Sequence, residues 1–137
     1  MYYRYRTTAN ISKLRQQFRR AYDAVARTLD SLLRSQPMVQ GSFYLLRRKC
    51  GKPTCRCTSG QLHPCWVLTR SEQGKDRLYP VPKDRRAQVR QWAAEYRRYQ
   101  RARARLVKQQ GQILALADQI AGQRLLTWPE KKTEKPP

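Results

Sequence analysis

CGKPTCRCTSGQLHPC, the stretch from Cys50 to Cys65, holds all four cysteines and the only histidine of the 137-residue chain. Its spacing is C-x4-C-x-C-x5-H-x-C. Thiolate and imidazole are donors that suit zinc, and structural zinc sites take four of them. Gly51, Pro53 and Gly60 supply tight turns that let nearby donors face one point. The stretch therefore predicts a small zinc knuckle, and Zn is the expected cofactor.

The pattern offers five candidate ligands: Cys50, Cys55, Cys57, His63 and Cys65. The first three would be joined by either His63 or Cys65 in a four-coordinate site. Two other interpretations stay open, since four cysteines can also form two disulfides or serve as small buried apolar side chains. A bond between Cys55 and Cys57 is disfavoured, because so short a ring strains a disulfide. The first residues lack the apolar core of a secretory signal, so we expect a cytoplasmic protein with reduced thiols.

The chain is strongly basic. It contains 30 Lys and Arg residues against 9 Asp and Glu residues, which gives a formal net charge of +21. Self-repulsion at this charge disfavours compactness, so a polyanionic partner is expected. DNA, RNA and an anionic membrane surface are the candidates, and the alternative is a basic protein without such a partner. No run of 18 apolar residues exists, so no transmembrane helix is predicted and no membrane partner is expected.

Two apolar stripes with helical spacing predict two helices. The first follows Asn10, a suitable N-cap, and ends near Gln36-Pro37. Its stripe contains Ile11, Leu14, Phe18, Ala21, Val25, Leu29 and Leu32. The second helix is expected over residues 85–121, with Asp84 as N-cap and Gly111 as a candidate bend or break. Its stripe contains Val89, Trp92, Tyr96, Tyr99, Leu106, Ile113, Ala117 and Ile120, while Arg103 and Gln110 fall where apolar residues are expected.

Three short strands are predicted between the helices, over residues 42–47, 66–70 and 77–81, with a turn at Gly74 and an edge position at Pro80. The expected fold class is α+β. Two long helices form an antiparallel hairpin, and a small three-stranded antiparallel sheet bearing the Cys/His knuckle is inserted between them. The expected organisation is a basic, tyrosine-rich tail at 1–9, a single helix–knuckle–helix domain at 10–126 with knuckle and strands at 41–82, and a disordered tail at 127–137.

Several motifs together resemble a known family. They are GSFYLLRRKCGKPTCRC at 41–57, the later His63, Leu68-Thr-Arg, Gly74-Lys, Tyr79-Pro-Val-Pro-Lys83, and a helix with Val89, Trp92 and Tyr96-Arg-Arg. Over residues 41–108 the chain is similar to a bacterial and archaeal family of small basic proteins with a domain of unknown function, often near mobile elements. That family usually has His-Gly-Pro-Tyr where this chain has His63-Pro64-Cys65-Trp66. The resemblance favours His63 over Cys65 as the fourth ligand, and it implies no activity.

The favoured function is nucleic-acid binding, mainly to the phosphate backbone, and analogy with the resembling family favours DNA over RNA. One group of basic residues surrounds the cysteines: Arg47, Arg48, Lys49, Lys52 and Arg56. A second group falls opposite the apolar stripe of the second helix: Arg90, Arg97, Arg98, Arg101, Arg105 and Lys108. Both groups are also what a solvated surface would contain.

An enzyme is not expected, because the acids are scattered and no phosphate-binding glycine pattern occurs. The alternative function is a helical protein–protein interaction module that forms a homodimer or binds an acidic protein. A role accessory to a mobile element follows from the resemblance alone.

Overall fold

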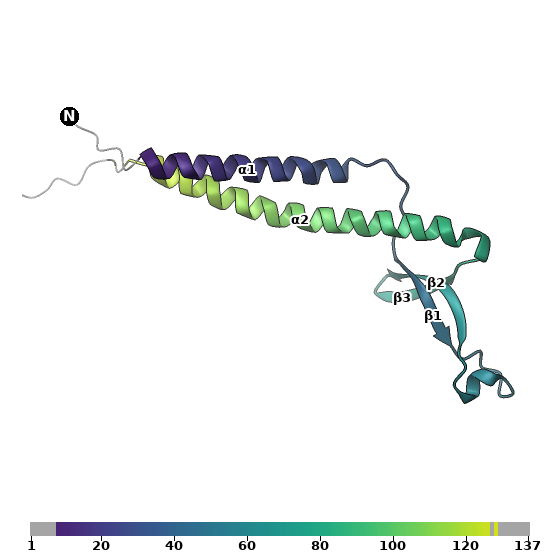
Figure 1. Cartoon of the computed structure of the whole chain (residues 1–137). Coiled ribbons are helices and arrows are strands. Elements are labelled where there is room, and N and C mark those ends of the chain that lie inside the picture. The colour runs from purple at the N-terminus through teal and green to yellow at the C-terminus, as the bar shows by residue number, and fades with distance from the viewer. Residues whose placement is uncertain (1–7, 127, 129–137) are drawn as a thin grey trace, which may run out of the picture. The chain divides into compact units, whose positions relative to one another are not determined.

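The computed structural model describes residues 8–126 and 128 (Figure 1). Two helices flank, in sequence, a three-stranded antiparallel sheet, which confirms the expected fold class. The elements in order are α1 Thr8–Leu32, β1 Ser42–Arg48, the 3-10 helix η1 Arg56–Ser59, β2 His63–Glu72, β3 Lys75–Pro80, the 3-10 helix η2 Lys83–Arg85 and α2 Arg86–Arg124. The predicted tails at 1–9 and 127–137 lie outside the described residues, apart from residues 8 and 9, which are helical, and Trp128.

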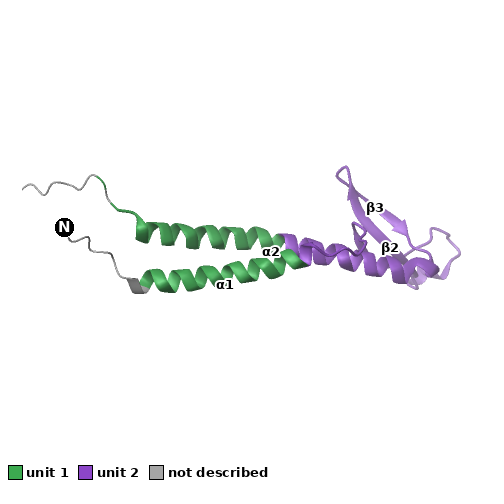
Figure 2. Ribbon diagram, turned by 90° about the horizontal axis from the view of Figure 1, so that it is seen from above, with its two compact units in different colours: residues 1–30, 104–137 green, residues 31–103 purple. Residues whose placement is uncertain are grey.

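The chain divides into two compact units, coloured separately in Figure 2. Unit 1 comprises Met1–Asp30 and Ala104–Pro137, and unit 2 comprises Ser31–Arg103. Unit 1 therefore contains most of α1 and the second half of α2. Unit 2 contains the sheet, the cysteine-rich loop and the first half of α2.

In unit 1, α1 and the second half of α2 lie side by side and run in opposite directions, as the helical hairpin predicted (Figures 1 and 2). Stripe residues such as Leu14, Phe18, Ile113 and Ile120 are half-buried. Among the described side chains of unit 1, Thr28 alone is buried, with 2% of its surface exposed. The hairpin therefore has no fully buried apolar side chain in its described part.

The helix boundaries differ from the predicted ones. Helix α1 begins at Thr8, so Asn10 lies within the first turn and does not cap the helix. It ends at Leu32, before the predicted end near Gln36-Pro37. Helix α2 continues without a break through Gly111. A single glycine costs about 1 kcal/mol in a helix interior, and good helix formers on both sides outweigh that cost.

The inner face of α2 also departs from the predicted stripe at Arg103 and Gln110, which are both exposed. Ala102 is buried, with 3% of its surface exposed, and Arg103 is exposed. A heptad count from Val89 and Tyr96 would instead turn Arg103 inward. Burying a guanidinium without a partner is costly, whereas alanine loses little side-chain entropy and allows close packing. The inner face therefore passes through Ala102.

The sheet of unit 2 has the strand order β1-β2-β3, with both pairs antiparallel. Strand β3 is an edge strand, which is consistent with Pro80 at its end. Between β2 and β3, Gln73 (φ 51°) and Gly74 (φ 78°) both adopt positive φ, as a two-residue type I′ hairpin requires. Strand β2 begins at His63 and is longer than predicted, because it pairs with β1 as far as Arg48.

A small core joins the sheet to the first half of α2. It consists of Leu68, Val81 and Ala93, with Val39, Phe43 and Val89 packed against it. Phe43 and Leu68 are direct partners in the β1–β2 register, so both point to the sheet face that α2 covers. The core thereby fixes the orientation of the sheet, and with it the loop that β1 and β2 carry, within unit 2.

Two further contacts hold the linker between α1 and β1 against α2. The guanidinium of Arg34 donates two hydrogen bonds to the carboxylate of Glu95, at 3.1 and 2.9 Å. The N–H of Val39 donates to the carbonyl of Trp92 at 3.2 Å. These bonds pin a segment that has no secondary structure of its own.

Candidate metal centre and basic surface

Strand pairing brings the candidate ligands together. Arg48, the last residue of β1, pairs with His63, the first residue of β2. Because Arg48 and His63 are paired, the loop that joins them begins and ends at the same end of the sheet. Cys50 lies in this loop, two residues after the end of β1. Cys55 is the N-cap residue of η1, and Cys57 lies within η1. Residues that are separated in sequence by a whole loop thus meet at one end of the sheet.

Backbone hydrogen bonds shape the loop that carries the cysteines. The N–H of Cys55 donates to the carbonyl of Lys52 at 3.2 Å, and the N–H of Thr58 donates to the carbonyl of Cys55 at 3.1 Å. The hydroxyl of Thr58 donates to the same carbonyl at 2.7 Å. Gly60 ends the 3-10 helix with φ 110°, a conformation that side chains with a Cβ rarely adopt. The loop is therefore built from local turns.

Four donor atoms converge in this loop. The Sγ atoms of Cys50, Cys55 and Cys57 and a ring nitrogen of His63 all lie within 4.8 Å of one another. The Sγ atoms of Cys50 and Cys57 are 3.5 Å apart, and Sγ of Cys55 is 3.0 Å from Nε2 of His63. A tetrahedral zinc site with bonds of about 2.0–2.3 Å separates its ligand atoms by roughly 3.3–3.8 Å. The group could hold a metal ion with small adjustments, and the four cysteines form no disulfide.

The fifth candidate, Cys65, lies outside the group of four donors. Its Sγ is instead 3.9 Å from the carbonyl oxygen of Trp66. His63 and Cys65 point to the same face of β2, but they are two positions apart along the strand. Both line a cavity together with Cys50, but only His63, at the start of the strand, brings its donor atom into the group of four. The geometry therefore agrees with His63 as the fourth ligand, as the resemblance implied.

The environment shifts the pKa values of the three thiols in different directions. The N–H of Lys52, followed by the Cys55 and Cys57 side chains, lowers the pKa of Cys50. The N–H of Cys57, followed by His63, lowers the pKa of Cys55. For Cys57 the N–H of Cys50 acts to lower the pKa, but burial and the neighbouring thiols together raise it. Three thiolates this close repel one another, and a divalent cation between them would remove that repulsion.

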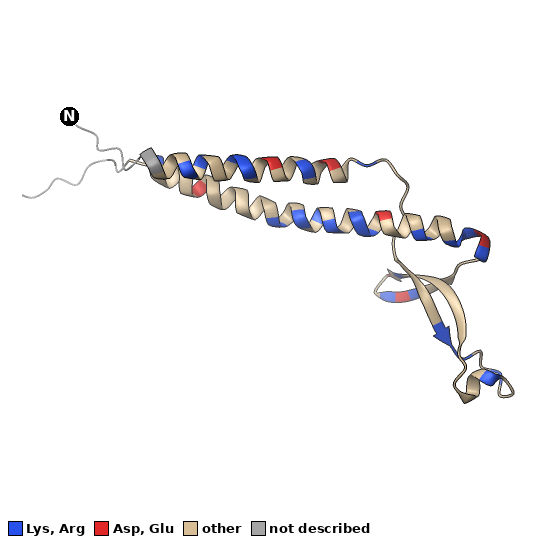
Figure 3. Ribbon diagram, viewed as in Figure 1, with Lys and Arg blue, Asp and Glu red and all other residues tan. Residues whose placement is uncertain are grey.

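Basic side chains surround the donor group. Arg47, Arg48, Lys49, Lys52 and Arg56 are all exposed. The sequence contains no acidic residue between Asp30 and Glu72. None of the five forms an ion pair within the part of the chain that the structure describes. In Figure 3 this cationic loop, at the far end of β1, carries blue segments and no red one. Arg48 and Lys49 also line a cavity of about 490 Å³ together with Cys50, His63 and Cys65.

A model of a family described as a domain of unknown function, DUF6788, matches residues 11–91, more than half of the chain. The chain belongs to the DUF6788 family. The matched segment contains all five candidate ligands and ends at the start of α2. The expectation of a family with a domain of unknown function is thus confirmed. No curated protein and no solved structure matches the chain.

The six basic residues predicted on the second helix of this DUF6788 protein are all exposed, but they do not form one equivalent set. Arg97 and Arg101 have no acidic partner among the described residues. Arg98 is 3.2 Å from the carboxylate of Glu95, one turn away. Arg105 and Lys108 belong to the helical hairpin of unit 1, whereas the other four belong to unit 2.

Arg90 has a role that sequence reasoning missed. Its guanidinium carbon lies 5.6 Å from the ring centroid of Phe43 and 5.1 Å from that of Trp66. The two rings are stacked, with centroids 5.0 Å apart. Leu45 pairs with Trp66, so the β1–β2 register would have placed both rings on one sheet face, but the register was not readable from spacing alone. Arg90 therefore binds α2 to the sheet.

No helix in the described part of this DUF6788 protein is long and apolar enough to cross a membrane.

Two glutamates in unit 2 each pair with two arginines. Glu72 pairs with Arg70 and Arg77 and accepts a hydrogen bond from Tyr79, and Glu95 pairs with Arg34 and Arg98. These carboxylates stabilise the fold around them and leave the cations of the cysteine-rich loop uncompensated.

Proposed function

We propose that this protein is a nucleic-acid-binding module in which a structural zinc knuckle holds a basic loop against the phosphate backbone. The observation that carries the proposal is the coincidence of two features in one loop. Four side chains that could hold a metal ion converge in it, and five exposed cations without acidic partners among the described residues surround them. A loop of 3-10 and turn structure needs such a cross-link, because it has little apolar surface to bury.

Zinc is the metal that the donor set favours. Three sulfurs and one imidazole nitrogen match a closed four-coordinate structural site, which has no open position for a substrate. Three thiolates and one divalent ion leave a single net negative charge on the site. The five surrounding cations outnumber that charge, so the loaded knuckle would remain an electropositive surface.

A phosphate backbone suits the cationic loop better than a solvated surface does. Surface charges are normally interleaved with opposite charges, and here no acid is within the sequence from residue 31 to 71. Phosphates would relieve the repulsion among Arg47, Arg48 and Lys49, and binding would release condensed counterions. Such contacts carry little sequence information, so binding is expected to tolerate changes of sequence.

The choice of DNA over RNA, and a role accessory to a mobile element, rest only on the resemblance described above. A binding rather than a catalytic role is supported by the assignments of the reactive side chains. His63 lies with the cysteines, and Glu72 and Glu95 are bound by arginines. A cytoplasmic location agrees with reduced thiols that bind a metal, since a reducing compartment preserves them.

The test compares binding to duplex DNA, single-stranded DNA and RNA of equal length over a series of salt concentrations. On duplex DNA, log Kd should vary linearly with log salt, and each neutralised phosphate contributes about 0.9 to the slope. The double variant Lys52→Gln/Arg56→Gln should reduce the slope by about two units. The control Lys75→Gln/Arg77→Gln removes the same charge from the β2–β3 hairpin of the same unit. This control should reduce the salt slope by less than the loop variant does.

Equal losses in the two double variants would mean that only net charge matters, and the loop assignment would be wrong. Salt-independent or undetectable binding to all three nucleic acids would contradict the proposed function itself. Stronger binding to RNA would overturn the preference for DNA and leave the phosphate contacts in place.

A further inference from the structure

One face of the helical hairpin in unit 1 is apolar and uncovered. On α1, Phe18, Tyr22, Val25 and Leu29 follow one another at steps of four, three and four, so they share one side of the helix. Tyr22, in the middle of α1, is 62% exposed, and Leu29, in its last turn, is 43% exposed. On α2, Leu114 is 63% exposed. We define the apolar hairpin face by Phe18, Tyr22, Leu29, Leu106, Leu114 and Ile120.

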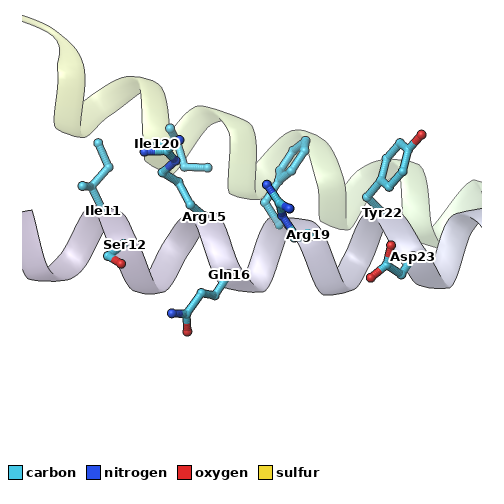
Figure 4. A pocket seen from close by; sticks show the side chains of 9 residues that line it. Ile11, Ser12, Arg15, Gln16, Arg19, Tyr22, Asp23 and Ile120 are labelled. Atoms are coloured by element: carbon cyan, nitrogen blue, oxygen red, sulfur yellow. The ribbon is translucent and has the colours of Figure 1, made fainter.

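Two hollows along this face connect the helices. The larger has a volume of about 980 Å³. Its apolar lining comes from Ile11, Phe18 and Tyr22 of α1 and Ile120 of α2, and its polar lining comes from Ser12, Arg15, Gln16, Arg19 and Asp23 of α1. Figure 4 shows Ile11 and Ile120, from different helices, at one end of it and Tyr22 at the other. The second hollow has a volume of about 480 Å³, and Leu29, Leu106 and Leu114 contribute to it. The helices therefore form a grooved surface to which both contribute apolar side chains, bordered by polar ones.

Another hollow of the same hairpin has a different lining. Most of its lining is polar: Asn10, Lys13 and Gln17 of α1 and Gln119 and Gln123 of α2, with Leu14 and Gly122 beside them. The hairpin is thus amphipathic as a whole, with a polar side and an apolar side. Because no described apolar side chain of unit 1 is fully buried, the pair of helices has only half of a core. A second helical hairpin laid on the apolar side would complete a four-helix bundle.

The distribution of charge favours a second copy of the chain as the partner that covers the apolar hairpin face. Residues 109–123 contain a single charged residue, Asp118, in a chain of net charge +21. Two copies of so basic a chain repel each other, and this segment adds no cation to that repulsion. The rim of the larger hollow carries both signs, with Arg15, Arg19 and Asp23. A two-fold interface brings a surface against itself, so a rim with both signs can pair with its own copy.

We propose that two copies of this chain associate through the apolar hairpin face to form a four-helix bundle. Each copy would cover the hollows of the other, and the polar side lined by Lys13, Gln17 and Gln119 would remain in solvent. An acidic partner protein would instead be expected to seek cations, and the face is poor in them on its α2 side. The proposal does not depend on nucleic-acid binding, since it uses residues of unit 1 alone.

The experiment measures the mass of the metal-loaded chain by sedimentation equilibrium in the absence of nucleic acid, over a wide range of protein concentration. The expected mass is twice the 16.2 kDa of one chain. Leu114→Glu places a carboxylate in the centre of the interface and should weaken dimerisation by about tenfold or more. Gln119→Glu introduces the same charge five residues away on the polar side and should leave the dimer intact.

A monomer at every concentration would overturn the proposal, and so would equal dimerisation by the Leu114→Glu and Gln119→Glu variants. Helical circular dichroism equal to that of the unaltered chain shows that a variant is folded. If Leu114→Glu loses its helix signal, Tyr22→Ser decides, because it shortens an exposed side chain without adding charge. A Tyr22→Ser chain that dimerises as strongly as the unaltered chain would contradict the assigned face.

Discussion

Nε2 of His63 lies 3.0 Å from Sγ of Cys55, and the two residues belong to different elements. Cys55 is the N-cap residue of η1, without a capping hydrogen bond from its side chain, and His63 is the first residue of β2. A metal ion bound at this point would tie the irregular loop to the hydrogen-bonded sheet. The sheet is itself fixed to α2 by the core around Leu68. The position of the loop's cations would therefore depend on this one cross-link.

The identity of the fourth ligand can be tested by paired substitutions. His63→Ala should reduce metal affinity by at least about tenfold, because even partners of metal ligands contribute that much and His63 is expected to bind the metal directly. Cys65→Ala should retain the affinity, since its thiol lies outside the donor group. Competition with a chromogenic chelator measures both, with about one zinc per unaltered chain as the reference. A larger loss in Cys65→Ala would assign the site to Cys65.

Removal of the metal should affect the two units differently. All four donors belong to unit 2, so a chelator should disorder the loop and lower the thermal midpoint recorded by the fluorescence of the chain's tryptophans, among them Trp66. The helical circular dichroism should change little, because α1 and the second half of α2 contain no donor. Addition of zinc should restore the midpoint. An unchanged midpoint in a verified metal-free sample would mean that no structural metal is bound.

The sequence was sufficient for the order and type of the two helices and three strands, but it did not predict the two 3-10 helices, and it left the fourth donor open between His63 and Cys65. Apolar residues at three- and four-residue steps mark both helices, and four cysteines with one histidine in so short a stretch favour a metal site over disulfides or buried thiols. The details that failed depend on tertiary contacts. Asn10 has the right chemistry for an N-cap, but the helix begins earlier, at Thr8. Arg90 falls opposite the apolar stripe, yet the sheet turns Phe43 and Trp66 toward it.

Gly41 should not tolerate a side chain. Its φ is 132°, and a Cβ built on it would lie 2.7 Å from the carbonyl oxygen of Thr69. Gly41→Ala would therefore strain the backbone and push β1 away from β2, at a cost of about 1–3 kcal/mol. Chemical denaturation measures the loss. Gly111→Ala is the matched control, since a Cβ there meets nothing, and it should stabilise α2 by about 1 kcal/mol. Equal effects of the two substitutions would contradict this account.

Glu95 should make the stability of unit 2 depend on acid pH. Hydrogen bonding by Arg34, helped by the charge of Arg98 and opposed by partial burial, lowers the pKa of this carboxyl in the folded chain. A lowered folded-state pKa means that the stabilisation is present above the ordinary carboxyl pKa and is lost as the pH falls through the folded value. Glu95→Gln should therefore be less stable than the unaltered chain at pH 7, and the difference should shrink below about pH 4.

Denaturation at a series of pH values, followed by tryptophan fluorescence, measures this difference. Asp76→Asn is the control, because Asp76 is an exposed acid of the same unit and forms no ion pair in the described structure. The stability of the Asp76→Asn variant should parallel that of the unaltered chain over the whole pH range. A Glu95→Gln deficit that stays constant down to pH 3 would show that the Arg34 pair is not responsible.

The arginines of α2 within unit 2 should separate into a structural and a binding class. The guanidinium of Arg90 lies over Phe43 and Trp66, so Arg90→Gln should cost about 0.5–2 kcal/mol of stability. Its effect on the salt dependence of DNA binding should be small, because the cation is already engaged. Arg97 and Arg101 are exposed and unpaired among the described residues, so replacing both with glutamine should leave stability almost unchanged.

If the proposed function is correct, the same Arg97→Gln/Arg101→Gln variant should reduce the slope of log Kd against log salt by about two units, since each contact with duplex DNA contributes about 0.9. Salt titrations and denaturation of the two variants therefore form a crossed design, in which each changes one quantity and preserves the other. A flatter salt slope with full stability in Arg90→Gln would place Arg90 on the phosphate backbone. An unaltered slope in the double variant would move the proposed binding surface to the cationic loop around Lys52 and Arg56, where five exposed cations lie close together in sequence.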